Sequence, residues 1–571
     1  MAIPSRWSVD IPECSIHSWV FPSSFGALPT TPQFIDPERP DTHFLSLSDY
    51  RIWSKRVALG LRRAGLRTGD RVLLFSGNQL FTPVIFMGVM MAGGVFTGAN
   101  PSFVARELEY QLKDSGASFL VAADSSMDIA LEAAAKAGLP KDHVYAFDAT
   151  GIDPPPAKAK ARTDIGPRHW TELLVPVEDA EKFDWIEPAD PKTTICCLNY
   201  SSGTTGVPKG VEITHYNYVA NGVGIVHMLE RQHDFEDWRK RSRQIGFLPL
   251  YHAYGQTFYT CNFPRLGIPC YIMHGFDFER MLRYIQQFRI TSITAVPPIV
   301  VALAKHPIVK KYDLSSVESV TSGAAPLGKE ISDEVVKLWP EGAVSVRQGW
   351  GMTELTCSAV SWDFMAVVQG SAAVGEMMPN CEARIVRPED GSEVTTGGEP
   401  GEIWVSGPTL MKGYWNKPEA TADTIVVDSD GKRWLKTGDI AYIEKYEPGG
   451  LWHIVDRLKE LIKVKGNQVA PAELEAVLYE NKGVADAAVV GVTIDGEEYP
   501  RAYVVPTPGA KQTEKDIAAW MEGKVVHYKR LRGGVKFVDA IPKNPVSFIY
   551  ILSMRIMKAG VRQNQSGHTH G

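Results

Sequence analysis

A loop rich in glycine and hydroxyl groups, directly behind an apolar run, is the most informative feature of this sequence. The run from Thr194 to Leu198 is apolar and β-prone, which predicts a buried strand. The residues that follow, from Ser201 to Val211, read SSGTTGVPKGV. Glycines let backbone N–H groups gather around an anion, while the hydroxyls and Lys209 add donors and positive charge. The loop therefore predicts a polyphosphate site, although Pro208 and Gly210 exclude the Walker A pattern.

Six further segments follow the loop along the chain. They are PLYHAYG at 249–255, SGAAPL at 322–327, QGWGMTE at 348–354, GEI at 401–403, KTGD at 436–439 and IVDRLKELIKVKGNQVAPAELE at 454–475. Together with the loop they resemble the adenylate-forming (AMP-binding) superfamily, and within it the acyl- and aryl-CoA synthetase branch that includes 4-coumarate–CoA ligase. The resemblance covers about residues 45–545. It implies an α/β fold with a large N-terminal domain of layered α/β subdomains plus a β-barrel portion, and a small mobile C-terminal α+β lid.

The resemblance also implies a nucleotide site. The residues it assigns to ATP or AMP are Ser201, Ser202, Gly203, Thr204, Thr205, Gly206, Lys209, Gln348, Gly349, Trp350, Gly351, Met352, Thr353, Asp439, Arg457, Lys459 and Lys463. Trp350 stands where relatives usually carry tyrosine and is expected to stack on adenine, the alternative being a core tryptophan. Thr205 and Glu354 are the expected Mg²⁺ ligands, because this ion prefers hard oxygen ligands. Outside its motif, Glu354 would be interpreted as a surface carboxylate.

The acyl and CoA sites are likewise implied by the resemblance. The acyl pocket is assigned to His252, Tyr254, Phe258, Ala324 and Ala325, with His252 in an exposed loop as its gate. A lone histidine is more often structural, so this role depends on the family match. The CoA-facing residues are Lys465 and Gly466. Relatives that activate amino acids usually carry aspartate directly after this histidine, and Ala253 stands there instead, which disfavours an amino-acid substrate.

The expected reaction is that of an ATP-dependent acid–CoA ligase with ATP, Mg²⁺ and coenzyme A. An aryl or medium-chain aliphatic carboxylate would form an acyl-adenylate and then an acyl-CoA thioester, with Lys209, His252, Thr353 and Glu354 as catalytic residues. The end of the chain departs from the family: relatives carry a Pro-Lys-x-x-x-Gly-Lys type segment, whereas Phe548 falls near the expected lysine and the pattern is atypical from about residue 546. The alternatives are therefore a stand-alone adenylating enzyme that loads a carrier protein, a luciferase-like oxygenase, or a degenerate adenylate-binding protein with impaired adenylation.

The composition limits the partners. The net charge of −6 over 571 residues argues against nucleic acid, because binding to phosphate backbones requires a basic face. Seven scattered cysteines without metal-ligand spacing favour reduced thiols. Neither a signal peptide at the start nor a peroxisomal address at the end is recognised, which predicts a cytoplasmic location. The sequence leaves the particular acid and the oligomeric state open.

The apolar periodicity predicts several elements. Apolar residues from Phe278 to Phe288 recur at helical spacing, Ile290 to Val296 reads as a strand, and Pro297 is expected to begin a helix. The apolar stretch Val84 to Ala99 is too short to cross a membrane and is interpreted as one packed helix. Charge and apolarity alternate from Arg457 to Gly466, which predicts a half-buried hairpin strand. A boundary is expected at 455/456, giving an adenylation domain at 1–455 and a lid at 456–571.

Overall fold

The computed structural model describes residues 2–148, 168–201, 208–366, 368, 371–464, 467–494 and 497–541, and strands alternate with helices along most of them. The first sheet has eight strands in the order β22-β10-β9-β5-β4-β6-β7-β8. These strands are β4 (Arg71–Phe75), β5 (Val95–Ala99), β6 (Ala117–Ala123), β7 (Val144–Phe147), β8 (Arg168–His169), β9 (Ile195–Ser201), β10 (Lys209–Thr214) and β22 (Gly413–Tyr414). Neighbours from β9 to β8 are parallel, whereas β10 is antiparallel to both β9 and β22.

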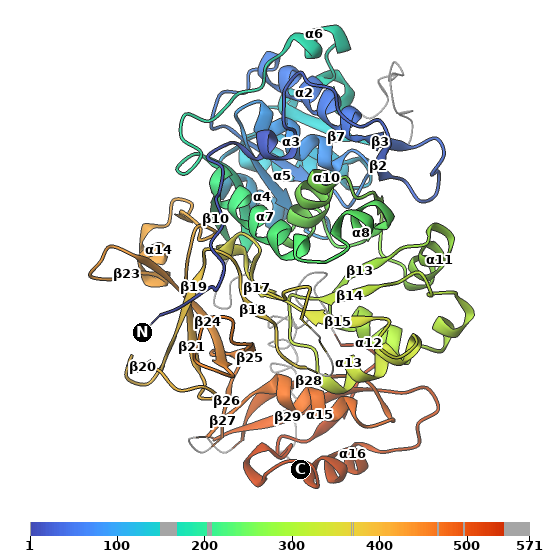
Figure 1. Ribbon diagram of the computed structural model, residues 1–571, viewed down its shortest axis with the longest axis vertical. Coiled ribbons are helices and arrows are strands. Elements are labelled where there is room, and N and C mark those ends of the chain that lie inside the picture. Colours follow the sequence, from blue (N-terminus) through green and yellow to red (C-terminus); the bar gives the residue numbers. More distant parts are fainter. Residues whose placement is uncertain are drawn as a thin grey trace, which may run out of the picture.

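Helices cover both faces of this sheet (Figure 1). Successive side chains of β4 alternate between two cores: Val72 and Leu74 join the main hydrophobic cluster, whereas Leu73 and Phe75 join a second one. The helices involved are α2 (Leu47–Arg63) and α3 (Thr82–Met91) on the first face, and α4 (Ala105–Ser115) and α5 (Met127–Ala137) on the second. Burial on both faces explains why the strands are apolar runs rather than alternating ones.

One expectation for this region was wrong. The stretch from Val84 to Ala99 is not a single helix, because α3 ends at Met91 and β5 begins at Val95. Gly93 has a φ of 76°, a left-handed conformation that ends the helix and redirects the chain into the sheet. Since helix and strand are both fully buried here, the apolar pattern could not separate them.

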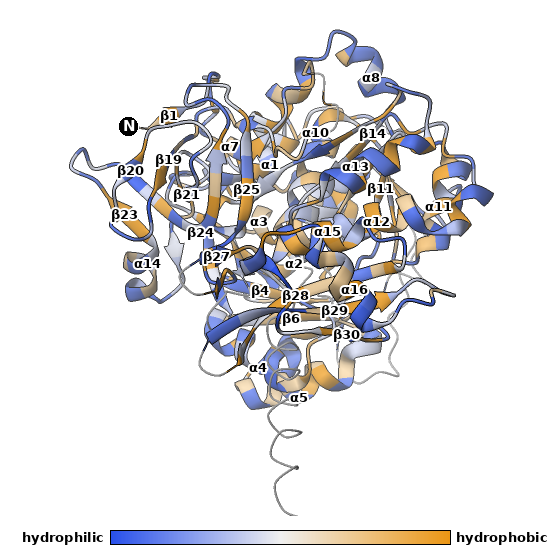
Figure 2. Ribbon diagram, turned by 90° about the horizontal axis from the view of Figure 1, so that it is seen from below, coloured by the Kyte–Doolittle hydropathy of each residue, from blue (hydrophilic) through white to orange (hydrophobic). Residues whose placement is uncertain are grey.

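The second sheet has seven strands in the order β15-β14-β13-β11-β12-β2-β3, parallel except for the β2–β3 pair. These strands are β2 (Pro32–Ile35), β3 (Phe44–Ser46), β11 (Gln244–Gly246), β12 (Cys270–Ile272), β13 (Ser292–Ala295), β14 (Ser319–Ser322) and β15 (Ser345–Gln348). The predicted helix is α11 (Phe278–Phe288), and Figure 2 shows hydrophobic and hydrophilic residues mixed along it. Helix α12 (Pro297–Lys305) begins at the predicted proline, and α13 (Lys329–Val335) follows.

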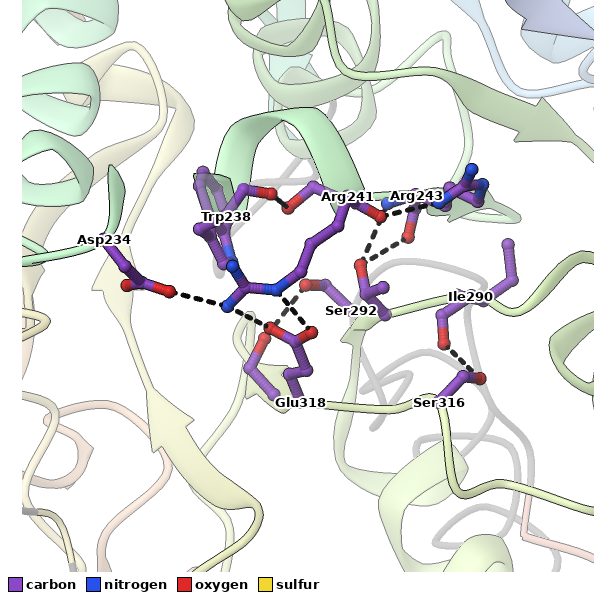
Figure 3. Close-up of polar contacts among 11 residues, drawn as sticks. Asp234, Trp238, Arg241, Arg243, Ile290, Ser292, Ser316 and Glu318 are labelled. Carbon is purple, nitrogen blue, oxygen red and sulfur yellow. Dashed lines mark hydrogen bonds and ion pairs between the residues drawn. The ribbon is translucent and has the colours of Figure 1, made fainter. Parts of the chain in front are cut away.

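Polar contacts fix the amino ends of these parallel strands (Figure 3). Arg241, at the end of α8 (Phe235–Arg241), donates to both carboxylate oxygens of Glu318 and pairs with Asp234 at 2.8 Å. The Ser316 hydroxyl donates to the carbonyl of Ile290. This network lies at the edge opposite to the carboxyl ends of β14 and β15, so it stabilises the sheet and does not contribute to the predicted site.

A third, antiparallel sheet stands where the β-barrel portion was expected, at the left of Figure 1. Its strands are β1 (Ile3–Pro4), β19 (Glu382–Val386), β20 (Glu393–Val394), β21 (Gly401–Ser406), β23 (Ile425–Val427), β24 (Arg433–Ile443) and β25 (Trp452–Arg457). A short sheet of β16 (Trp350–Gly351), β17 (Ser358–Ser361) and β18 (Glu376–Met377) lies between the larger ones. Helix α7 (His215–Glu230) packs against β17: the side chain of Asn221 donates to the Ser358 carbonyl at 2.7 Å.

The C-terminal part is α+β and has its own core. Its elements are β26 (Ile462–Val464), β27 (Asn467–Val469), α15 (Pro471–Tyr479), β28 (Val484–Ile494), β29 (Glu497–Pro506), α16 (Glu514–Glu522) and β30 (Val535–Phe537). The predicted hairpin is the β26–β27 pair, with Ile462 and Val464 buried and Lys463 exposed. The expected boundary at 455/456 falls inside β25 and stays a prediction. No helix in the described part of the chain is both long and apolar enough to cross a membrane.

A close backbone approach links the first sheet to the segment that carries His252. A Cβ atom at Gly98, in β5, would lie 2.8 Å from the Cβ atom and 2.9 Å from the carbonyl oxygen of Tyr251. We expect Gly98→Ala to lower the free energy of unfolding by roughly 1–3 kcal/mol, because the backbone there has no room to move away. Urea unfolding followed by tryptophan fluorescence measures this change.

Gly523→Ala is the matched control, since the nearest atom to a Cβ there is 3.7 Å away. It should change the free energy of unfolding by less than about 0.5 kcal/mol. Equal stabilities of the two variants would contradict the proposed tight contact.

Candidate active site

The two ends of the polyphosphate loop are held opposite each other. Ser201 ends β9 and Lys209 begins β10, and the two residues are register partners in the antiparallel pair. The Ser201 hydroxyl is buried and bonds to no other described residue. The predicted phosphate-binding residues Ser202, Gly203, Thr204, Thr205 and Gly206 lie outside the described residues, so the assignment of Thr205 to Mg²⁺ stays a prediction.

Helix α4 fixes both ends of the loop, through residues that the sequence analysis missed. The Tyr110 hydroxyl donates to the Pro208 carbonyl at 2.9 Å. The Tyr200 hydroxyl donates to one oxygen of Asp114 at 2.8 Å, and Lys417 pairs with the other at 2.5 Å. These partners are about 100 to 300 positions apart in the sequence, and only Tyr200 and Pro208 flank a recognised motif. No local pattern marks the others.

Lys209 and Glu354 are brought to the same place. Glu354 lies in the buried 3₁₀ turn η7 (Thr353–Leu355), and its Oε1 atom accepts a hydrogen bond from the Tyr414 hydroxyl at 2.9 Å. The Nζ atom of Lys209 lies 4.5 Å from the centroid of the same tyrosine ring, a cation–π contact. The predicted phosphate cation and the predicted metal ligand therefore share one aromatic side chain, which the sequence analysis did not single out.

The three residues assigned to adenosine also lie together. Asp439 and Arg457 are register partners on β24 and β25, with Nε of Arg457 3.7 Å from Oδ1 of Asp439. The indole N–H of Trp350 donates to Oδ2 of Asp439 at 2.8 Å. Burial raises the pKa of Asp439 and Glu354 adds to the increase, whereas Arg457 and Trp350 act against it. This coupling places Glu354 within electrostatic reach of Asp439, so the phosphate and ribose groups belong to one site.

Two of the assigned residues have their side-chain surroundings already defined. Trp350 is 8% exposed, which leaves only a small part of its ring open in this conformation. The side-chain amide of Gln348 exchanges two hydrogen bonds with the backbone of Leu327, at 2.8 and 2.9 Å, and its backbone carbonyl accepts from Trp362. Gln348 thus holds the carboxyl end of β15 to the loop that follows β14. Its assignment to the nucleotide stays a prediction, as do those of Gly349, Gly351, Met352 and Thr353.

The residues assigned to the acyl group surround the same region. His252 is half-buried rather than exposed as expected, and its Nδ1 atom accepts from the Tyr254 backbone N–H at 3.4 Å. This contact assigns the ring proton of the neutral imidazole to Nε2. Tyr254 packs edge-to-face on Phe258 with centroids 5.3 Å apart, and a Cβ atom at Gly323 would lie 3.2 Å from the Tyr254 ring.

The turn before His252 is fixed by Asn78, which follows β4. Its side chain donates to the Leu248 carbonyl at 2.9 Å and accepts from the Leu250 N–H at 2.8 Å. The strands β4 and β11 therefore present their carboxyl ends to one another across this turn. Ligands of open parallel sheets bind outside the carboxyl ends of the strands, and the predicted site follows this rule.

Two predicted lysines lie apart from this cluster. Lys459 is exposed in the turn after β25, and Lys463 is exposed on β26, where its backbone N–H donates to Glu498. Among the described contacts, neither ammonium group reaches Lys209, Glu354 or Asp439. The CoA-facing pair, Lys465 and Gly466, lies outside the described residues, as does the chain from residue 542 onward.

The donor set around Glu354 fits Mg²⁺ held jointly with phosphates. The Tyr414 hydroxyl occupies Oε1 of Glu354, which leaves Oε2 for a cation. Within the described ranges no group of three or more His, Cys, Asp or Glu side chains could hold a metal. Mg²⁺ is usually bound by one or two carboxylates together with substrate phosphates and water, and a single carboxylate beside a phosphate loop suits this mode.

Comparison with known proteins identifies the family. The AMP-binding enzyme family matches residues 26–415, and the AMP-binding enzyme C-terminal domain matches residues 473–546. The chain is 36% identical to phenylacetyl-CoA ligase epaB of Aspergillus niger, over 95% of this chain and 97% of that protein. It is 38% identical to 4-coumarate–CoA ligase 1 of Petroselinum crispum, over 87% of this chain and 86% of the relative. The chain therefore belongs to the AMP-binding enzymes.

A solved structure agrees with the fold. The crystal structure of ATP-bound MatB from Rhodopseudomonas palustris matches with a TM-score of 0.79 and 26% identity, over 96% of this chain and 99% of that one. The superposition includes both the large N-terminal part and the C-terminal α+β part. The predicted family and fold class are both confirmed.

Buried neutral histidines predict a pH dependence of stability. Burial lowers the pKa of His252 to about 4 and those of His17 and His215 to about 3, whereas an unfolded histidine titrates near 6.5. Below pH ~6.5 the unfolded chain therefore binds protons that the folded chain refuses, so each such histidine lowers stability as the pH falls toward its folded pKa.

We expect His252→Gln to reduce the slope of unfolding free energy against pH by up to ~1.4 kcal/mol per unit between about pH 4.5 and 6.5. Urea unfolding at several pH values measures the slope in both proteins. The wild type is the necessary reference, because burial raises the pKa of Glu475 to about 8 and gives the opposite sign. Identical slopes would mean that His252 is not held neutral.

Proposed function

We propose that this chain is an ATP-dependent acid–CoA ligase. In the first step a carboxylate oxygen attacks the α-phosphorus of ATP, and pyrophosphate leaves to give an acyl-adenylate. In the second the thiol of CoA attacks the acyl carbonyl, and AMP leaves with the thioester formed. The convergence of Lys209, Glu354 and Asp439 at one site carries this proposal. Relatives named as CoA ligases, which align with nearly the whole chain, support it.

The roles follow from charge and placement. Both reactants of the first step are anionic, so the site must offset their repulsion and hold them in line. Lys209 would offset charge on the departing pyrophosphate, and Asp439 with Arg457 would hold the ribose hydroxyls. The neutral His252 would donate from Nε2 to the carboxylate or the α-phosphate. When bound, Mg²⁺ would neutralise phosphate charge, with Glu354 and Thr205 as its protein ligands.

An aryl or medium-chain aliphatic acid fits the acyl pocket best. The assigned wall of Tyr254 and Phe258 is aromatic, and Ala324 and Ala325 leave room for a flat or extended group. Ala253 is buried and offers no carboxylate to a substrate ammonium group. Leaving that ammonium unpaired would cost several kcal/mol, on the order of a thousandfold or more in selectivity. The relatives named phenylacetyl-CoA and 4-coumarate–CoA ligases support an aryl acid.

Two further assignments are part of this proposal. Residues 456–571 would form the lid that turns between the two steps, with Lys465 and Gly466 facing CoA and with Lys459 and Lys463 brought to the nucleotide. The cytoplasm would be the compartment, since all seven cysteines are free thiols, as in a reducing environment.

A second candidate function is favoured by one observation in the sequence. Phe548 falls near the position where relatives carry the lid lysine that acts in adenylation. A protein that lacks this cation would bind adenylates and still complete the thioester step, yet form acyl-AMP slowly. The loss would be roughly a hundred- to thousandfold, by analogy with removing an oxyanion donor.

The decisive experiment measures both steps on one panel of acids. Acid-dependent ATP–pyrophosphate exchange reports adenylation, and acyl-CoA formation with AMP release reports the complete reaction. We expect an aryl or medium-chain acid to give the fastest complete reaction and free α-amino acids to give none. Exchange without any CoA product would favour loading of a carrier protein. Slow exchange with rapid use of synthetic acyl-AMP and CoA would favour the degenerate enzyme, and inactivity in both assays would contradict the proposal.

Trp350 should act on ATP rather than on the acid. We expect Trp350→Ala to raise the KM for ATP about tenfold while the KM for the acid changes little, because stacking on a base contributes ~1–3 kcal/mol. Trp350→Phe should give a smaller rise, since it keeps a ring and loses only the N–H donated to Asp439. Steady-state kinetics with each substrate varied in turn measures both constants.

Trp339→Phe is the control, because its indole N–H donates to the Leu314 carbonyl in the core, away from the site. A rise in the KM for the acid, with that for ATP unchanged, would contradict the assignment of Trp350 to adenine.

A further inference from the structure

A short segment joins the phosphate-loop strand to the turn that carries Glu354. The segment from Met411 to Trp415 pairs with β10, since the Trp415 N–H donates to the Gly210 carbonyl at 2.8 Å and the Lys412 N–H to the Glu212 carbonyl at 2.9 Å. At its other end the Met411 N–H donates to the Glu354 carbonyl at 2.9 Å. The backbone of this segment therefore sets the separation between β10 and η7.

Tyr414 extends this connection through its side chain. It is 7% exposed, its ring faces the ammonium group of Lys209, and its hydroxyl donates to Oε1 of Glu354. Burial raises the pKa of Tyr414, and the nearby carboxylate of Glu354 raises it further. The phenol therefore remains protonated and remains a donor at every physiological pH.

The same ring keeps two opposite charges apart. Lys209 and Glu354 form no ion pair with each other or with any other residue that the structure describes, although both reach the same side chain. A direct pair would neutralise the cation and the carboxylate before a ligand arrives. With the aromatic ring between them, the ammonium group is free for phosphate and one carboxylate oxygen is free for a metal ion.

We propose that Tyr414 is a positioning residue that holds Lys209 and Glu354 apart and aims them at the phosphates and the cation of Mg²⁺-bound ATP. The inference rests on the proposed function, because that function supplies the nucleotide. It adds a distinct division of labour within one side chain. The hydroxyl orients the carboxylate toward the metal ion, and the ring positions the lysine toward phosphate.

Binding of ATP, with and without Mg²⁺, separates the two parts of the proposal. Isothermal titration calorimetry is run on the purified full chain in MgCl₂ and in EDTA. Tyr414→Phe keeps the ring and loses the hydroxyl, so affinity for Mg²⁺-ATP should fall roughly tenfold, while affinity for metal-free ATP should change less than about twofold. Tyr414→Ala removes both contacts and lets Lys209 approach Glu354, so it should weaken binding under both conditions.

Tyr284→Phe is the matched control. Tyr284 is also a buried tyrosine that donates its hydroxyl to a carboxylate, that of Glu38, but it lies on α11 away from the site. It should leave both affinities unchanged. Synthetic acyl-AMP with CoA provides a second readout, because pyrophosphate has already left at that stage. Tyr414→Phe should use this mixture at the wild-type rate, whereas a general disturbance of the fold would slow it.

The outcomes are distinguishable. Equal Mg²⁺-ATP affinities of Tyr414→Phe and Tyr284→Phe, in a chain that binds ATP, would overturn the role of Tyr414 and leave the proposed function intact. Equal losses for Tyr414→Phe with and without Mg²⁺ would overturn the role of the hydroxyl. A wild-type chain that binds no ATP and does not use acyl-AMP would overturn the proposed function, and the inference with it.

Discussion

The pairing of β10 on both of its edges is the constraint on which the candidate site depends. On one edge β9 places Ser201 opposite Lys209 and so fixes the two ends of the phosphate loop. On the other edge β22 places Tyr414 opposite Val211, about 200 residues away in sequence. Because backbone hydrogen bonds tolerate little displacement, these pairings fix where the lysine, the tyrosine and, through Met411, the Glu354 turn must lie. The chemistry of the loop thus depends on an edge strand of only two residues.

Charge is kept available at this site by partners that do not neutralise it. Lys209 faces an aromatic ring, Glu354 accepts from a phenol, and Asp439 accepts from an indole while Arg457 stays 3.7 Å away. Burial raises the pKa of Asp439, so its carboxylate depends on these donors to remain ionised. Neutral donors orient a carboxylate without cancelling its charge, which suits a site that must bind a cation and a polyanion in turn.

Backbone strain is concentrated in the same region. Ala324 has a φ of 71° and Thr356 one of 68°, conformations that cost non-glycine residues about 1–3 kcal/mol. Ala324 follows β14 beside the assigned acyl pocket, and Thr356 follows Glu354. The Thr356 hydroxyl donates to the Thr409 carbonyl at 2.7 Å, which helps to hold the turn in this conformation. Both residues keep loops close to the ligand positions where relaxed conformations would turn them away.

The sequence alone determined the class of chemistry. The loop from Ser201 to Val211 and the ordered motifs after it are local patterns, and they indicated the polyphosphate site, the family and the layered α/β fold. Helix α11 and the β26–β27 hairpin were predicted because their periodicities are written in consecutive residues. The tertiary structure decided what consecutive residues cannot encode. The stretch from Val84 to Ala99 divides into a helix and a strand, because both are buried all round and apolarity has no period there.

The roles of Tyr414, Asp114 and Asn78 were also beyond the sequence. Their partners lie from about 60 to 300 positions away, and only strand pairing and helix packing bring them together. The same holds for the neutral state of His252, since burial is a property of the folded chain and not of its neighbours in sequence. The sequence therefore specified which groups do the chemistry, and tertiary packing specified their spacing and charge.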